Sequence, residues 1–270
     1  MRTAMGGAPD ANTSPIVVSQ DGAVGIVELA RPDKFNCLSL AVHVAIDSAL
    51  TRFEAPGSGV RALLIRAQGK NFCTGADLDE VKDLRQRPEE LAAFLARGHA
   101  ALRRLESSRL PVIAACRGLC LAGGLELMMA CDVVFAAHDA RFGDQHAQFG
   151  LVPGWGGSQR LPRLVGLRRA LDLFYSARWI DAAEAKEWGL VNTLCEADAV
   201  DADALAYAHQ VATRSLGGIA TMKQLARDGL EGSLSDGLDL EERLAMPVLL
   251  GADVSEGLDA FVARRKPNFG

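Results

Sequence analysis

Short apolar segments alternate with helical patterns between residues 15 and 195, and this alternation most constrains the fold of the chain. Each apolar segment has the length of a strand, and each helical pattern repeats apolar residues at intervals of three and four. Strands and helices in alternation predict an α/β fold. The expected strands are Ile16–Ser19, Val24–Leu29, Val60–Arg66, Pro111–Cys116, Asp132–Ala137 and Val191–Leu194.

Local turn and capping signals support this prediction. Asp21-Gly22 lies between the first two expected strands, which indicates a β-hairpin. Ser39 is expected to cap a helix that runs to about Glu54, and Pro88 to begin another long helix. Shorter helices are expected at Leu125–Cys131 and near residues 157–165, 167–176 and 181–188.

The last part of the chain is almost wholly helical, from Ala199 to Phe261. Breaks are expected at Gly217-Gly218, Gly232 and Gly251. We therefore divide the chain into a disordered tail (1–14), an α/β core (15–198) and a helical C-terminal region (199–270). Periodicity leaves open whether this region covers the core or builds a subunit interface.

Composition excludes several classes of protein. Among 270 residues, 49% are hydrophobic and 23% charged, which is incompatible with a largely disordered chain. The net charge of −5 argues against a nucleic-acid partner that binds bulk positive charge. No apolar run approaches the ~20 residues that span a bilayer, so no membrane partner is expected.

Six cysteines lie in apolar segments without a CxxC pair, which indicates reduced thiols rather than a disulfide framework or a zinc site. The first 14 residues lack the apolar centre of a signal peptide. Together these two features predict a cytoplasmic protein.

Two glycine-containing loops, Gly69–Leu78 and Arg117–Leu127, each follow an expected strand and lead into a helix. A helix N-terminus offers unpaired backbone N–H groups and a partial positive charge. If the two ends converge, their N–H groups form an oxyanion hole. The alternative is that both loops are ordinary tight turns. Neither contains GxxxxGK[ST] or GxGxxG, and the chain contains no GxSxG.

Glu126 adds a candidate acid or base to the second loop. It stands among apolar residues, where a carboxylate is expensive to bury, and it lies three residues after Gly123. Burial would raise its pKa toward the range useful for proton transfer. The alternative is an amphipathic helix from which Glu126 faces water.

Several further motifs occur in a characteristic order. They are Gly75-Ala76-Asp77-Leu78, the Ala-Gly-Gly-Leu-Glu-Leu segment at 122–127, Cys131-Asp132, Phe142-Gly143, and the segments 150–161, 182–191 and 256–266. With these motifs the chain resembles the enoyl-CoA hydratase/isomerase (crotonase) superfamily from about residue 15 to its end. The resemblance specifies the superfamily far better than the reaction, because one fold hosts many reactions.

The resemblance implies a crotonase-like core of repeated ββα units and a helical C-terminal region used in trimerisation. It further implies a homotrimer or a dimer of trimers, an acyl-CoA thioester as substrate, a place in fatty-acid metabolism, and neither metal nor cofactor. Ala76 and Gly123 match the backbone donors that hold the thioester oxygen. Asp77 and Leu78 match positions near the adenine end of CoA.

Two tail residues, Phe261 and Arg264, match positions that approach CoA in this family, in some cases from a neighbouring subunit. The alternative for Phe261 is simple helix packing. The residues expected to help line the acyl pocket are Leu119, Leu121, Phe149 and Trp155.

The second catalytic position departs from the family pattern. Hydratases of this superfamily use two glutamates: Glu126 matches the first, and His146 occupies the position of the second. A histidine titrates near neutral pH and could replace an acid or a base. Asp144 lies two residues away and is expected to orient the ring if this stretch is extended.

We therefore expect reversible addition of water to a 2-enoyl-CoA, with Glu126 and His146 as the catalytic pair. Another crotonase-type reaction is the alternative within the family: isomerisation, decarboxylation or C–C hydrolysis of an acyl-CoA. A third hypothesis is an acyl-CoA-binding protein of low activity, because half of the usual carboxylate pair is absent.

Overall fold

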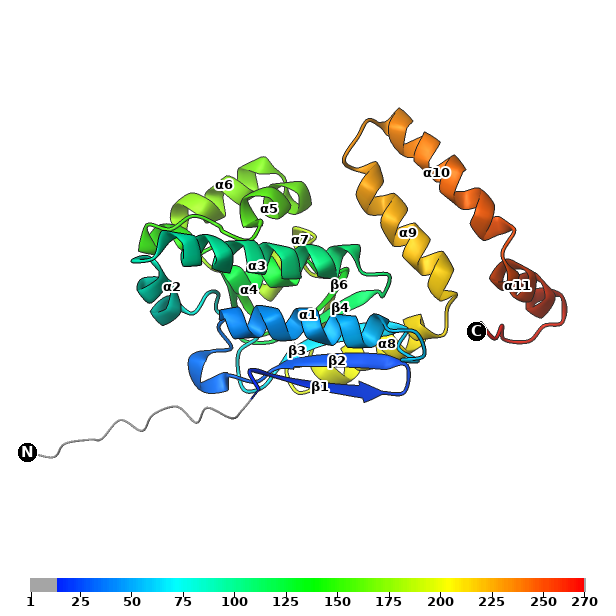
Figure 1. Ribbon diagram of the computed structural model, residues 1–270, viewed down its shortest axis with the longest axis horizontal. Coiled ribbons are helices and arrows are strands. Elements are labelled where there is room, and N and C mark those ends of the chain that lie inside the picture. The colour runs from blue at the N-terminus through cyan, green and yellow to red at the C-terminus, as the bar shows by residue number, and fades with distance from the viewer. Residues whose placement is uncertain (1–13, 270) are drawn as a thin grey trace, which may run out of the picture.

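The computed structural model describes residues 14–269 and has an α/β core with a helical C-terminal part (Figure 1). Apart from Ser14, the expected tail lies outside the described residues. A main sheet has the order β1-β2-β3-β4-β6-β9, in which only the β1–β2 pair is antiparallel. Its strands are β1 (Ile16–Asp21), β2 (Val24–Leu29), β3 (Ala62–Ala67), β4 (Val112–Cys116), β6 (Val133–Ala137) and β9 (Thr193–Cys195).

The predicted hairpin is confirmed, since Asp21 pairs with Val24 across the turn. The last strand begins two residues later than expected, because Asn192 holds the end of β6 instead of joining β9. Its side chain accepts a hydrogen bond from the Val134 N–H, and its own N–H donates to the Val134 carbonyl.

A second, smaller sheet was not predicted. It contains β5 (Leu119–Leu121), β7 (Arg141–Gly143) and β8 (Ile180–Asp181), and a bridge between Cys73 and Cys120 extends its line. Part of the segment expected to be a simple connection is thus the strand β5. Strands of two or three residues are too short to show a period of two, which is why the sequence pattern did not indicate them.

The two sheets together produce the repeated ββα unit that the resemblance implies. Each of β3, β4 and β6 belongs to the main sheet and is followed by a segment at the second sheet. A helix then follows each segment: α2 (Leu78–Leu84), α4 (Gly123–Met129) and α5 (Gly157–Val165). The chain therefore advances by one strand of each sheet per repeat.

The remaining helices follow the sequence prediction closely. They are α1 (Leu40–Glu54), α3 (Pro88–Ser107), α6 (Leu167–Ser176), α7 (Ala182–Glu187), α8 (Val200–Ala212), α9 (Leu216–Gly229), α10 (Leu234–Leu249) and α11 (Ala252–Val262). The short 3₁₀ turns η1 (Pro32–Lys34) and η2 (His146–Phe149) were not predicted. Ser39 caps α1 as expected, because its side chain accepts from the Val42 N–H.

The break expected at Gly217-Gly218 is wrong. Both glycines lie in the first turn of α9, where the Ser215 hydroxyl accepts a hydrogen bond from the Gly218 N–H. A capped first turn tolerates glycine, because its N–H groups find their partner outside the helix.

The main sheet is buried on both faces. Successive residues of β3 point to opposite sides: Leu63 and Ile65 join the cluster beneath α1, α3 and α4, whereas Ala62 and Leu64 pack against α8. The helix α8 therefore belongs to the core packing although it falls in the expected C-terminal region. Beyond it, α9, α10 and α11 extend away from the sheets (Figure 1).

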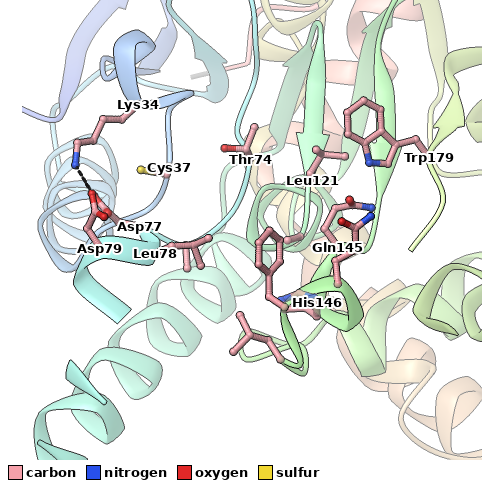
Figure 2. Close-up of a pocket in the computed structure, with 15 residues that line it drawn as sticks. Lys34, Cys37, Thr74, Asp77, Leu78, Asp79, Leu121, Gln145, His146 and Trp179 are labelled. Carbon is pink, nitrogen blue, oxygen red and sulfur yellow. Dashed lines mark hydrogen bonds and ion pairs between the residues drawn. The ribbon is translucent and has the colours of Figure 1, made fainter. Parts of the chain in front are cut away.

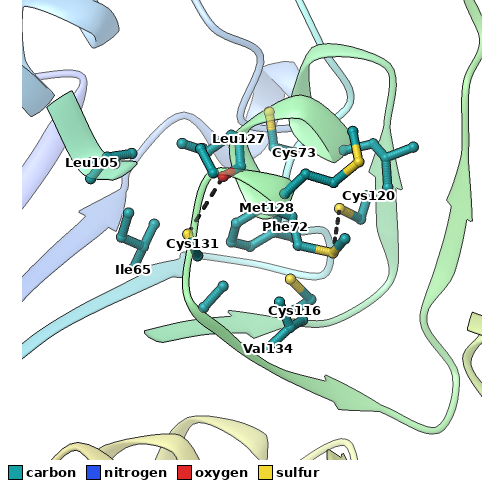
Figure 3. Packing of buried hydrophobic residues seen from close by; sticks show 14 of the residues in the cluster. Ile65, Phe72, Cys73, Leu105, Cys116, Cys120, Leu127, Met128, Cys131 and Val134 are labelled. Carbon is teal, nitrogen blue, oxygen red and sulfur yellow. Dashed lines mark hydrogen bonds between the residues drawn. The ribbon is translucent and has the colours of Figure 1, made fainter. Parts of the chain in front are cut away.

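The larger cluster holds four of the six cysteines, and Figure 3 shows Cys73, Cys116, Cys120 and Cys131 around the buried helix α4. All six cysteines are buried and free in the described chain. Burial raises the pKa of the Cys73 thiol to about 12. No helix within residues 14–269 combines the length and apolar character that crossing a bilayer requires.

Candidate active site

Three consecutive ββα repeats bring the candidate residues together. The parallel pairings Cys73–Cys120 and Cys120–Phe142 align the second-sheet segments of these repeats. Ala76 and Gly123 each follow their aligned cysteine by three residues. They therefore lie side by side where the chain leaves the second sheet, and a Cβ added to Gly123 would stand 3.2 Å from the Gly75 Cα.

The N–H group of Ala76 faces the open side of its segment. Leu38 donates to the Gly75 carbonyl at 2.7 Å and accepts from the Asp77 N–H at 2.9 Å, so it bonds to both neighbours of Ala76. N–H groups of successive extended residues point in opposite directions. The Ala76 N–H therefore points away from Leu38, toward the cavity that Ala76 lines.

Gly123 is the first residue of α4, so its N–H has no acceptor within the helix. Ala122 before it adopts φ 49° and ψ −118°, a strained conformation for a residue with a Cβ, and donates to the Gly143 carbonyl. A Cβ on Gly123 would stand 2.7 Å from Cζ3 of Trp155, so the position requires glycine. Two N–H groups beside one cavity are what an oxyanion hole needs.

Glu126 is buried with 1% of its surface exposed, so the alternative in which it faces water is wrong. Its Oε1 accepts from the N–H groups of Trp155 at 2.8 Å and Gly157 at 2.7 Å. Gly157 begins α5, and the carboxylate supplies the cap that the Gly156 N-cap lacks. Burial raises the pKa of Glu126, although the two N–H groups and His146 oppose the shift.

The turn that binds Oε1 does not hold the second oxygen of Glu126, Oε2. Among the described residues no hydrogen-bond partner contacts Oε2, although the atom is buried. It lies 3.9 Å from Nε2 of His146. This distance exceeds a hydrogen bond but lets one water contact both atoms from the side.

Asp144 orients His146 as expected, with its Oδ1 2.9 Å from Nδ1 of the ring. The stretch is not extended as the prediction assumed. Gln145 turns the chain with φ −102° and ψ 5°, and η2 begins at His146. Burial lowers the pKa of His146, but the hydrogen bond and charge of Asp144 and the charge of Glu126 outweigh it, so the pKa is raised.

Two cavities meet at this pair, and Ala76, His146 and Leu151 line both. The first has a volume of about 550 Å³ and is also lined by Lys34, Asp77 and Trp179 (Figure 2). The second has a volume of about 750 Å³, contains Glu126 and Gly123, and has apolar walls. The large apolar residues of the second cavity include Val81, Leu91, Phe94, Leu95, Val152 and Trp155.

Asp77 and Leu78 line the first cavity. Their expected place near the adenine end of CoA stays a prediction. Leu78 is partly exposed, whereas Asp77 is buried and paired with Arg31 at 2.7 Å. Burial alone would raise the pKa of Asp77, but the hydrogen bond and charge of Arg31 and the charge of Lys34 lower it. Because Arg31 already pairs with the Asp77 carboxylate, this group stabilises the cavity wall rather than serving as a free hydrogen-bond acceptor.

The expected acyl-pocket residues are divided between the two cavities. Trp155 lines the second cavity, whereas Leu121 and Phe149 line the first, and Leu119 is not among the described residues that line either. The tail residues Phe261 and Arg264 lie at the α11 end of the chain, remote from α2 in Figure 1. They do not line these cavities within the described chain.

Sequence reasoning missed the turn that holds Glu126. The Gly154-Trp155-Gly156-Gly157 segment forms a tight turn before α5. Its N–H groups also form the binding site of a carboxylate 29 and 31 residues away in sequence. The dense glycines were the available signal, since a Cβ on Gly157 would stand 3.2 Å from Oε1 of Glu126.

Comparison with known proteins agrees with this geometry. The sequence profile of the family described as enoyl-CoA hydratase/isomerase matches residues 19–270. The chain belongs to this family. A probable enoyl-CoA hydratase of Mycobacterium tuberculosis is 39% identical over 254 residues, which covers 94% of this chain and 97% of the relative.

Two further members of the enoyl-CoA hydratase/isomerase family illustrate the similarity. A probable enoyl-CoA hydratase of Rhizobium meliloti is 37% identical, with 94% of this chain and 97% of the relative covered. The crystal structure of an enoyl-CoA hydratase from Bacillus anthracis superposes with a TM-score of 0.89 at 33% identity. That alignment covers 94% of this chain and 98% of the other.

Proposed function

We propose that this protein reversibly adds water to the double bond of a 2-enoyl-CoA, giving a 3-hydroxyacyl-CoA. The observation that carries the proposal is the placement of Glu126 Oε2 and His146 Nε2. They stand 3.9 Å apart where the two cavities meet, beside the N–H groups of Ala76 and Gly123. A thioester carbonyl bound by those two N–H groups brings its double bond next to the acid–base pair.

In the proposed reaction a water contacts both Glu126 and His146. Glu126 removes its proton while the water oxygen bonds to C3 of the substrate. Negative charge moves onto the thioester oxygen, where each N–H donor stabilises it by about 3 kcal/mol. His146 then gives its Nε2 proton to C2.

The proton balance closes within the same pair. After one turnover Glu126 is protonated and His146 is neutral, and a new water relays the proton from Oε2 back to Nε2. Asp144 keeps the ring oriented and favours the imidazolium form that donates to C2. The raised pKa of Glu126 makes it a stronger base than an exposed carboxylate.

The first experiment incubates the purified protein with crotonyl-CoA and with a longer 2-enoyl-CoA. Loss of the enoyl-thioester absorbance is followed, and the product is identified by mass. Glu126→Gln should lower the hydration rate by about 10²- to 10⁴-fold, the usual contribution of a positioned acid or base. Glu90→Gln, which changes an exposed carboxylate paired only with Arg87 among the described residues, should leave the rate unchanged.

The alternatives give different results in the same experiment. An isomerised, decarboxylated or cleaved product from a suitable acyl-CoA would replace hydration by another reaction of the family. Tight acyl-CoA binding with no turnover that depends on Glu126 would refute the hydratase proposal and favour a binding protein.

We also propose that the C-terminal helices form a subunit interface in a homotrimer or a dimer of trimers. Several large apolar side chains on and near α10 and α11 are exposed in the single chain, and Leu250, Phe261 and Val262 are 80–82% exposed. Exposed apolar clusters of this kind mark interaction sites. Light scattering should give three or six chains, and Phe261→Ser should weaken the assembly or raise the KM for the CoA ester.

A further inference from the structure

The turn formed by Trp155, Gly156 and Gly157 controls where the Glu126 carboxylate lies. Both of the hydrogen bonds that Oε1 accepts come from this turn, at 2.8 and 2.7 Å. Oε2 has no partner among the described residues that could hold the group in its place. The orientation of the whole carboxylate therefore depends on the position of two main-chain N–H groups.

The side chain of Arg160 holds this turn from the side opposite Glu126. It leaves the first turn of α5 and folds back so that Nη1 donates to the Trp155 carbonyl at 2.5 Å. Gly156 adopts φ +101°, and a Cβ at this position would collide with Nη1 of Arg160. The guanidinium thus lies directly against the backbone of the turn.

Glu106, on α3, holds Arg160 in that position. Its carboxylate accepts from Nε and Nη2 of the guanidinium, both at 2.6 Å, which is the paired geometry that fixes an arginine most firmly. Arg227 of α9 lies 3.3 Å from the same carboxylate and pairs with Asp132 on its other side. A chain of charged groups therefore runs from the C-terminal helices to the turn.

We propose that Arg160 is a positioning residue, which holds the Trp155–Gly157 turn so that Glu126 keeps Oε1 bound and presents Oε2 to His146. This inference rests on the proposed role of Glu126 as the base. Arg160 touches neither substrate cavity, since it is absent from the described residues that line them.

The action of Arg160 through the turn has a distinctive consequence. The titratable groups that face Glu126 are His146 and Asp144, and Arg160 is not among them. Its removal should act on Glu126 mainly through the turn, by weakening the two N–H donors that favour the ionised form. The pKa of Glu126 should then rise further, and the acid limb of the activity profile should move to higher pH.

The test compares Arg160→Met and Glu106→Gln with Arg163→Gln as a matched control. Arg163 lies on the same helix, but its side chain bonds only to Gln159 among the described residues. Arg160→Met should lower kcat by about 10- to 100-fold, because a misplacement of ~1 Å has that effect on a catalytic group. KM should change less than kcat does, since Arg160 itself lines neither cavity.

A second readout does not require turnover. Infrared difference spectra between each protein and its Glu126→Gln partner report the ionisation of this carboxyl group directly. The pKa of Glu126 should be higher in Arg160→Met and, by a smaller amount, in Glu106→Gln, and unchanged in Arg163→Gln. If the parent protein shows no hydration, the proposed function fails while this measurement still decides the role of Arg160.

Thermal unfolding separates positioning from general damage. The proposal is overturned if Arg160→Met and Glu106→Gln both lower the melting temperature but leave the acid limb and the pKa of Glu126 unchanged. If Arg160→Met does not fold, Glu106→Gln decides alone, because it preserves side-chain shape and removes only the charge that holds the guanidinium.

Discussion

Asp144→Asn offers the sharpest test of the catalytic pair. The Asp144 carboxylate accepts from Nδ1 of His146 at 2.9 Å, and an asparagine oxygen can accept the same hydrogen bond without its charge. Ring orientation is therefore retained. The pKa of His146 should fall, because the charge of Asp144 no longer opposes burial, whereas the charge of Glu126 and a weaker, neutral hydrogen bond remain.

The size of the effect follows from the bond that is weakened. A hydrogen bond to a charged group contributes about 1.5–3 kcal/mol and a neutral one about 0.5–1.5 kcal/mol, a difference of about 1–1.5 kcal/mol. Since 1.4 kcal/mol is tenfold, the imidazolium form of His146 becomes about 5- to 10-fold less favoured. At pH values above the pKa of His146, the hydration rate should therefore fall by about 5- to 10-fold.

The sign of the pH dependence is fixed by the role of His146. The ring must carry a proton to donate it to C2, so activity is present below its pKa and lost as the pH rises through it. The raised pKa places this loss above the ordinary value of 6.5, and Asp144→Asn should move it to lower pH.

Initial rates of crotonyl-CoA hydration from about pH 5 to about pH 10 measure both limbs. Asp139→Asn, an exposed neighbour, serves as the control. An alkaline limb that stays in place in Asp144→Asn would refute the assignment of His146 as the proton donor. An equal loss of activity at every pH would instead indicate a purely structural role for Asp144.

Three further predictions concern buried groups. Glu126→Gln should raise the free energy of unfolding by about 1 kcal/mol at neutral pH, measured in denaturant titrations. The pKa of Glu126 is raised above 4.5 in the folded protein. The gain should therefore be absent below pH 4.5, grow as the pH rises from 4.5 to the raised pKa, and stay constant above it. Gly123→Ala should cost about 1–3 kcal/mol of stability and most of the activity, through the clash with Trp155. The control Gly217→Ala, whose added Cβ meets nothing within 4 Å, should be neutral or stabilising. If the Gly123→Ala and Gly217→Ala proteins melted at the same temperature, this reasoning would be contradicted. The native protein should react slowly with a thiol reagent at mildly alkaline pH, because burial raises the pKa of Cys37 to about 11 and the other thiols are also buried; rapid labelling of several thiols would show that the core opens.

The sequence predicted the main sheet and most helices because their patterns are long enough to read. The hairpin from Ile16 and the capped helix after Ser39 carry local signals that the structure confirms. The second sheet escaped prediction because pairing partners such as Leu119 and Arg141 are distant in sequence and their strands hold three residues.

The site shows the same division between local and distant information. The burial of Glu126 was predictable from its apolar neighbours, and the contact between Asp144 and His146 from their spacing. The assumption of an extended stretch was wrong, because the chain turns at Gln145. Arg160 was not identified because no local sequence signal shows its two contacts, one with the Trp155 carbonyl and one with Glu106 on α3.

The alignment of three ββα repeats has a consequence for how such a site can diversify. The first repeat contributes Ala76, the second Gly123 and Glu126, and the third Asp144 and His146. In the proposed reaction, the amides that bind the thioester oxygen and the second proton carrier thus reside in separate repeats. A substitution in the third repeat would change the proposed acid–base pair and leave the other two repeats, with the strained backbone before Gly123, as they are. Divergence of the reaction can therefore proceed one repeat at a time.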